Sequence, residues 1–67
     1  MSQFYIVSES SEDIFDATND LQDAIRIARE VTRQGQSGDA VSVTHDGMTV
    51  RQFVLMPDGQ VAEEKVA

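Results

Sequence analysis

Carboxylates are the reactive groups that this sequence concentrates, and six of them fall between positions 9 and 23. They are Glu9, Glu12, Asp13, Asp16, Asp20 and Asp23. Grouped acids can hold calcium or steer a basic partner protein. The D-x-[DN]-x-[DN]-G pattern of a calcium loop does not occur, so we expect no metal ion. Two interpretations remain. Either these acids are solvated and favour a helix N-terminus, or Glu12, Asp13 and Asp16 form an acidic docking edge.

The other side chains that could do chemistry stand alone. His45 is the only histidine, and it adjoins the turn sequence Asp46-Gly47. The serines at positions 8, 10 and 11 lie among acids and have no neighbouring base to activate a hydroxyl group. No G-x-S-x-G motif, Gly-rich phosphate loop or cysteine is present. We therefore expect neither an enzyme nor a cofactor-binding protein.

Size and charge restrict the possible partners. The chain has 67 residues, a formal net charge of −7 and no cysteine, and we expect one domain spanning residues 1–67. An acidic surface repels nucleic acid and anionic membranes, which are bound mainly through Lys and Arg. It is compatible with a basic protein partner, and it also keeps a small protein soluble. The start MSQFYIVSES does not resemble a signal peptide, and no apolar run approaches the ~20 residues of a membrane span, so we expect a cytoplasmic protein.

The first half of the chain predicts a strand, a short return strand and a helix. Residues 3–9 are rich in aromatic and β-branched side chains, and residues 14–17 can return as a second strand or lead irregularly into the helix. The helix is expected over residues 21–34, after an N-cap at Asn19 or Asp20. Its apolar positions follow helical spacing, namely Leu21, Ala24, Ile25, Ala28 and Val31, with Ile27 at the margin. Gly35 is expected to end it with a positive φ.

The second half predicts three strands joined by tight turns. Residues 40–45 alternate in polarity, Asp46-Gly47 is typical of a type I′ hairpin turn, and residues 48–56 return as the partner strand. Pro57-Asp58-Gly59 predicts a type I turn followed by a glycine bulge, before a short last strand over residues 60–64. The expected fold is therefore α+β. It is a small two-layer sandwich of a mostly antiparallel sheet with one α-helix packed on one face.

Two of the expected strands carry apolar side chains on both faces. The first has Phe4 and Ile6 opposite Tyr5 and Val7, and the fourth has Phe53 and Leu55 opposite Val54 and Met56. A two-residue hairpin loop places Val54 and Met56 on the same side as Val41 and Val43, whereas a bulge near residues 51–52 exchanges the two sets. The sequence does not decide which set meets the helix.

One helix covers one face, so we expect another element or molecule to cover the second face. A contiguous apolar surface on a sheet tends to mark a contact site. The candidates are a second copy of the chain, a different protein, or the chain's own N-terminal loop or its tail VAEEKVA. Our leading hypothesis is a non-enzymatic protein-binding module, homodimeric through this face. The expected protein-binding residues are Tyr5, Val7, Val54 and Met56 on the face, with Glu12, Asp13 and Asp16 on the acidic edge.

The segment from Asp20 to Glu63 resembles a class of small acidic α+β proteins from bacteria and phages. The resemblance rests on a helix of the form x-x-A-I-x-x-A-R-E, here residues 23–30, and on the turn x-D-G-x-V, here residues 57–61. Some phage anti-CRISPR proteins are similar in length, topology and acidity. That similarity implies the alternative function of an inhibitor that docks its acidic surface on the basic nucleic-acid channel of a protein complex.

Overall fold

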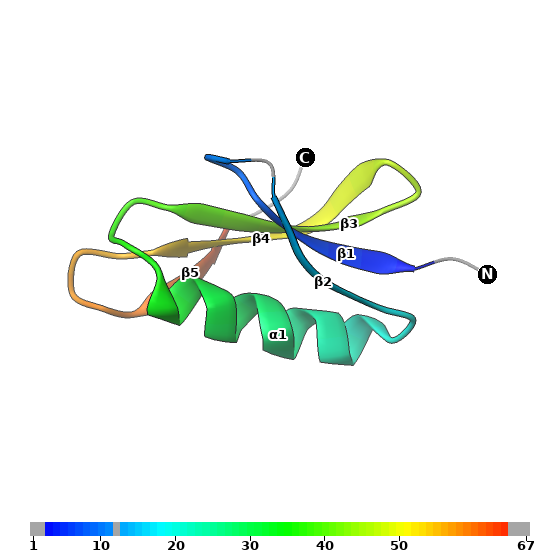
Figure 1. The fold of residues 1–67 in the computed structure, drawn as a ribbon. Helices are drawn as coiled ribbons and strands as arrows, with labels where there is room; N and C mark the ends of the chain where they lie inside the picture. Colours follow the sequence, from blue (N-terminus) through cyan, green and yellow to red (C-terminus); the bar gives the residue numbers. More distant parts are fainter. Residues whose placement is uncertain (1–2, 12, 65–67) are drawn as a thin grey trace.

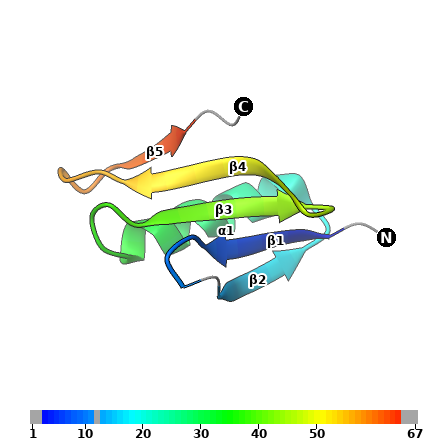
Figure 2. The ribbon, with the colours of Figure 1, turned by 90° about the horizontal axis from the view of Figure 1, so that it is seen from above.

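A computed structural model of the chain describes residues 3–11 and 13–64. The elements are β1 (Phe4–Ser8), β2 (Ile14–Thr18), α1 (Leu21–Gln34), β3 (Ala40–His45), β4 (Met48–Leu55) and β5 (Val61–Glu64). The strands form one antiparallel sheet in the order β2-β1-β3-β4-β5. The helix lies along one face of this sheet (Figure 1), and Figure 2 looks onto the other face with the helix behind it. The predicted α+β two-layer sandwich is confirmed, including the short return strand β2.

Local signals define both ends of α1. Asp20 is the N-cap, and its Oδ1 accepts a hydrogen bond from the Gln22 N–H at 2.9 Å. At the other end the Gly35 N–H donates to the Thr32 carbonyl oxygen at 3.1 Å. However, Gly35 has a φ of −85°, so its predicted positive φ is wrong. The chain leaves the helix in an extended conformation, and the left-handed position falls at Gly38, with a φ of 93°.

The helix meets the sheet through its smallest side chains. Ala24, Ala28 and Thr32 are buried, and the larger members of the predicted stripe flank them in partly buried positions. The Thr32 hydroxyl donates to the Ala28 carbonyl oxygen at 2.7 Å, so this buried polar group is satisfied within the helix. Small residues on the contact line allow the helix backbone to approach the strands closely, and the flanking apolar side chains fill the margins.

Both predicted turns are confirmed. Asp46 and Gly47 have φ angles of 54° and 80°, as a type I′ hairpin turn requires. In the second turn Gly59 has a φ of 89°, and its N–H donates to the Met56 carbonyl oxygen at 2.9 Å. These turns set the direction in which β4 and β5 return.

An irregularity in β4 decides which side chains meet the helix. Thr44 pairs with Thr49, whereas Val43 pairs with Arg51, so Val50 is an extra residue on β4. Beyond this bulge Val41 pairs with Phe53. Of the two arrangements that the sequence allowed, the one with a bulge is therefore correct. Phe53 and Leu55 face the helix, and Val54 faces away from it.

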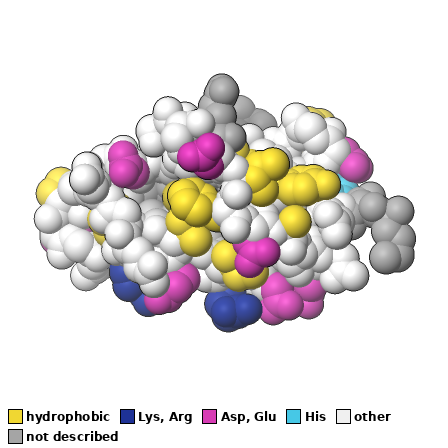
Figure 3. All heavy atoms as spheres, viewed as in Figure 1, with side chains coloured by type: hydrophobic (Ala, Val, Ile, Leu, Met, Phe, Trp, Pro, Cys, Tyr) yellow, Lys and Arg dark blue, Asp and Glu magenta, His cyan; other side chains and the backbone are white. Residues whose placement is uncertain are grey.

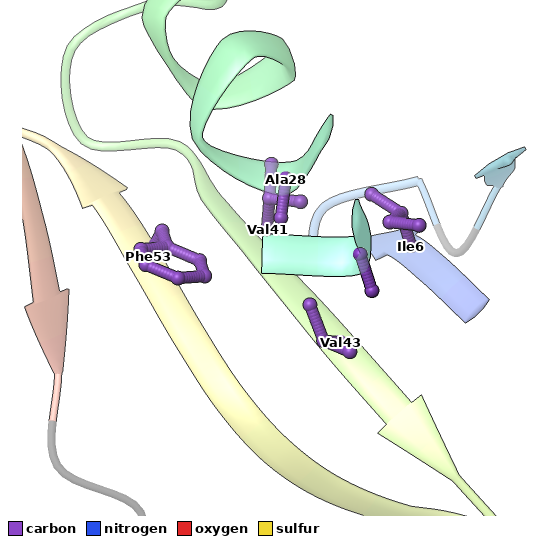
Figure 4. Packing of buried hydrophobic residues seen from close by; sticks show 6 residues of the cluster. Ile6, Ala28, Val41, Val43 and Phe53 are labelled. Atoms are coloured by element: carbon purple, nitrogen blue, oxygen red, sulfur yellow. The ribbon is translucent and has the colours of Figure 1, made fainter. Parts of the chain in front are cut away.

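The core lies between α1 and the three middle strands. Its fully buried members are Ile6 from β1, Val43 from β3, Phe53 from β4, and Ala24 and Ala28 from the helix. Figure 4 shows the side chains of β1, β3 and β4 directed toward the helix. Phe53 is the largest buried side chain, and burying a side chain of this size is worth about 2–3 kcal/mol.

Candidate functional site

The face of the sheet turned away from α1 is the first candidate surface, and we call it the open face. No helix or strand within residues 3–11 and 13–64 covers it. Strand alternation and register assign its residues on the three central strands. They are Tyr5 and Val7 from β1, Ala40, Ser42 and Thr44 from β3, and Thr49, Gln52 and Val54 from β4. None of these side chains is charged, although the chain carries a net charge of −7.

The apolar residues predicted for the binding face lie on this side of the sheet. Tyr5 is 38% exposed, and Val7 and Val54 are half-buried. Met56 follows directly after β4 and is 41% exposed. Its backbone N–H donates to the Gln60 carbonyl oxygen at 2.8 Å, which ties it to the start of β5.

The structure divides these apolar residues into two groups. Tyr5 and Val7 lie on β1 and Val54 lies on β4, with β3 between them. The register aligns Val7, Ser42 and Gln52 in one row across the sheet. Polar side chains therefore separate the two apolar groups, and the contiguous apolar surface expected from the sequence is not formed.

Ser42, at the centre of the open face, is buried and has a partner. Its exposed fraction is only 2%, and its hydroxyl donates to the Glu9 carboxylate. Glu9 continues β1 beside β3, because its N–H donates to the Ala40 carbonyl oxygen at 3.0 Å. Glu9 is thereby held at the margin of the open face by a hydrogen bond, although its side chain is still exposed.

The predicted acidic edge is formed in part. Asp13 precedes β2, and its carbonyl oxygen accepts the Ser8 N–H at 2.9 Å, while Asp16 lies within β2. Both side chains are exposed. Glu12 lies outside the described residues. The two described acids of the predicted edge, Asp13 and Asp16, therefore lie at the β2 side of the sheet and not among the residues of the open face on the central strands.

The sequence reasoning missed two exposed apolar residues in β2. Ile14 is 62% exposed and Phe15 is 52% exposed. Phe15 lines a shallow groove of about 270 Å³ together with Val31, Gln34 and Gly35 at the end of the helix. Figure 3 shows hydrophobic side chains gathered in the middle of this side of the molecule, with acidic side chains around them. Two adjacent apolar residues between acids were the available signal.

Groups for catalysis or metal binding do not converge in the described part of the chain. Among those residues no cluster of three His, Cys, Asp or Glu side chains could hold a metal ion. The His45 ring stacks on Phe4 with the ring centroids 4.4 Å apart, and its Nδ1 lies 3.7 Å from the Asp46 Oδ2. The helix of the structure as described is too short and too polar to cross a bilayer.

Comparison of the chain with protein-family models, curated proteins and solved structures found no match.

Proposed function

We propose that this protein is a non-enzymatic protein-binding module that forms a homodimer through its open face. The observation that carries the proposal is the composition of that face. It has apolar side chains at Tyr5, Val7, Val54 and Met56 and no charge on its three central strands. Two copies of an acidic protein repel each other wherever their charges meet, so the uncharged central strands of the open face offer them the least opposed contact.

The geometry suits the pairing of two sheets. Sheets pack face to face about 10 Å apart, and the side chains of the two inner faces interdigitate. A twofold axis places the same surface on both partners, so Tyr5 of one copy can meet the Val54 side of the other. The polar row of Ser42 and Gln52 is uncharged, and Ser42 is already hydrogen-bonded to Glu9, so burying it leaves no unpaired hydroxyl.

The size of the face limits how such a dimer is built. A standard interface buries about 800 Å² on each partner, which is roughly a fifth of the 4475 Å² accessible surface of this chain. A dimer of that kind must include the exposed Tyr5 and Met56 as well as the half-buried Val7 and Val54. We therefore propose a single interface that covers both apolar groups.

Sedimentation velocity over a range of protein concentrations tests the proposal. The wild-type protein is expected to shift from monomer to dimer, and Val54→Asp or Met56→Asp is expected to remain monomeric because each places a charge in the interface. Met48→Asp is the matched control, since Met48 is 70% exposed at the β3–β4 turn and outside the open face. Circular dichroism verifies that each variant is folded.

Two results would contradict self-association. One is a wild-type protein that stays monomeric at every concentration. The other is a folded Val54→Asp variant that dimerises as the wild type does. A folded Met48→Asp variant that loses the dimer would move the interface to the β3–β4 hairpin.

A further inference from the structure

Strand β2 forms an open edge of the sheet. It pairs with β1 on one side, and no strand of the described chain pairs with its other side. In an antiparallel ladder, consecutive residues direct their backbone groups to opposite sides. The Ser8 N–H bonds to Asp13 of the β2 side, and the Glu9 N–H bonds to Ala40 of β3. By this alternation Asp16 and Thr18 face β1, and the backbone groups of Ala17 point outward from the edge.

The outward Ala17 N–H already has an exchangeable partner. It donates to the Asp16 Oδ1 at 2.8 Å, and this contact is exposed to solvent. A carbonyl oxygen of an added strand can replace that carboxylate as the acceptor. The displaced Asp16 carboxylate is then free to pair with a cation on the added strand.

An apolar groove runs beside this edge. The register of β1 and β2 shifts between Asp16 and Ile14, so Phe15 is an extra residue on β2. Phe15 lines the groove with Val31, Gln34 and Gly35 of the helix end. A strand added next to β2 would therefore set alternate side chains against an exposed aromatic ring.

We propose that the β2 edge and the Phe15 groove bind an extended, basic segment of another protein, which adds to the sheet as a sixth strand. Addition of a strand to an exposed edge is a recurring mode of peptide recognition. The negative charge of this edge favours a basic segment as the added strand. Asp13 and Asp16 are exposed on this edge, and Asp20 and Asp23 follow at the start of the helix. The first basic residue of the chain, Arg26, lies 3.9 Å from Asp23.

A second copy of this chain does not suit the edge. Antiparallel pairing of two β2 strands would bring Asp13 and Asp16 of each copy close to the same acids of the other. Like charges placed opposite each other across a strand pair are destabilising. Asp16 pairs with the core residue Ile6 and so lies on the helix side of the sheet, as the groove does. A segment that carries both Lys or Arg and apolar residues on that side satisfies the acids and the groove together.

Amide NMR of the ¹⁵N-labelled protein tests the proposal with a short capped peptide of the repeat Lys-Lys-Val-Val, which presents both residue types on each face of the strand. Saturable shift changes are expected at Phe15, Ala17 and Val31, together with slower hydrogen exchange of the Ala17 amide. Binding is expected to weaken as salt is raised, because the paired charges are exposed. Two control peptides separate the contributions: a Glu-for-Lys form removes the charge match, and a fully N-methylated form removes the backbone donors. Neither control is expected to bind.

Variants of the protein provide matched comparisons. Asp13→Asn/Asp16→Asn is expected to weaken binding about fivefold, because exposed ion pairs are individually modest. The control Asp58→Asn/Glu64→Gln removes the same charge from the opposite end of the sheet and is expected to leave binding unchanged. Phe15→Ser should weaken binding, and Met48→Ser, at another exposed apolar position that lies outside the groove, should not.

The proposal is overturned if the N-methylated peptide binds as well as the parent, or if the shift changes map to the open face. Equal losses in the two double-charge variants would indicate attraction by net charge alone and would also overturn it. The dimer test uses Val54 and Met56, whereas this test uses Asp13, Asp16 and Phe15. Failure of strand addition therefore leaves the proposed dimer untouched, and failure of the dimer leaves strand addition untouched.

Discussion

The described residues leave both the open face and the β2 edge uncovered, but these surfaces offer different kinds of contact. On the open face the backbone groups of the central strands are paired within the sheet, so only side chains are available, and those of β1, β3 and β4 are uncharged. On the β2 edge one side of the ladder has no strand partner in the part of the chain that the structure describes, and Asp13 and Asp16 lie beside it. The two surfaces differ in charge and therefore favour different partners. A second copy of this acidic chain suits the open face, and a basic segment suits the β2 edge.

Loss of the shared core should remove both surfaces at once. Phe53 is fully buried between the sheet and the helix, and Phe→Ala changes in cores cost about 3–5 kcal/mol. The whole stability of a domain of this size is about 3–5 kcal/mol. We expect Phe53→Ala to be largely unfolded by circular dichroism, with no dimer and no peptide binding. A folded Phe53→Ala protein that keeps either activity would show that the activity does not need this packing.

A change at the centre of the open face should strengthen self-association alone. Ser42 and Gln52 separate the two apolar groups, and Gln52→Leu reduces this polar row to the buried Ser42. Burial of the added apolar surface should contribute about 1.4 kcal/mol, which makes the dimer about tenfold tighter. Sedimentation equilibrium measures this change, and binding of the Lys/Val peptide should be unaltered. An unchanged dimer constant would place the interface elsewhere.

The corresponding change in the groove should affect peptide binding alone. Gln34 lines the groove with Phe15, and Gln34→Leu extends the apolar surface. We expect peptide affinity to rise by about threefold to tenfold, since the groove is shallow and burial is partial. NMR titration measures it, with the dimer constant as the internal control. A tighter dimer in this variant would mean that the two surfaces are not independent.

The helix N-cap separates structural from electrostatic contributions at the acidic edge. Asp20→Ala removes the cap and should lower the free energy of unfolding by about 1 kcal/mol in urea denaturation. Asp20→Asn keeps a capping oxygen and removes the charge, so stability should change little. Peptide binding should fall slightly and equally in both variants. A larger loss of binding in Asp20→Ala than in Asp20→Asn would show that helix order, and not charge, supports the edge.

Much of the fold could be predicted because its signals are local. The Asp20 cap, the apolar stripe of the helix and the Asp46-Gly47 turn each depend on a few neighbouring residues. Gly35 was an exception: a glycine permits a positive φ without requiring it, and the path toward β3 placed the left-handed residue at Gly38 instead. The candidate site was harder to predict, because exposure depends on strand order. β2 is an edge strand, which leaves Ile14 and Phe15 in solvent.

The amino-acid sequence alone determined the strands other than β2, where the helix begins, and that the acids gather before Arg26. Only the tertiary structure decided that Phe53 is buried and Val54 is not. The physical reason is that strand side chains alternate with a period of two, so the single extra residue at Val50 exchanges the two faces of β4. Whether a strand accommodates that residue depends on the packing of its neighbours, which the local sequence does not contain.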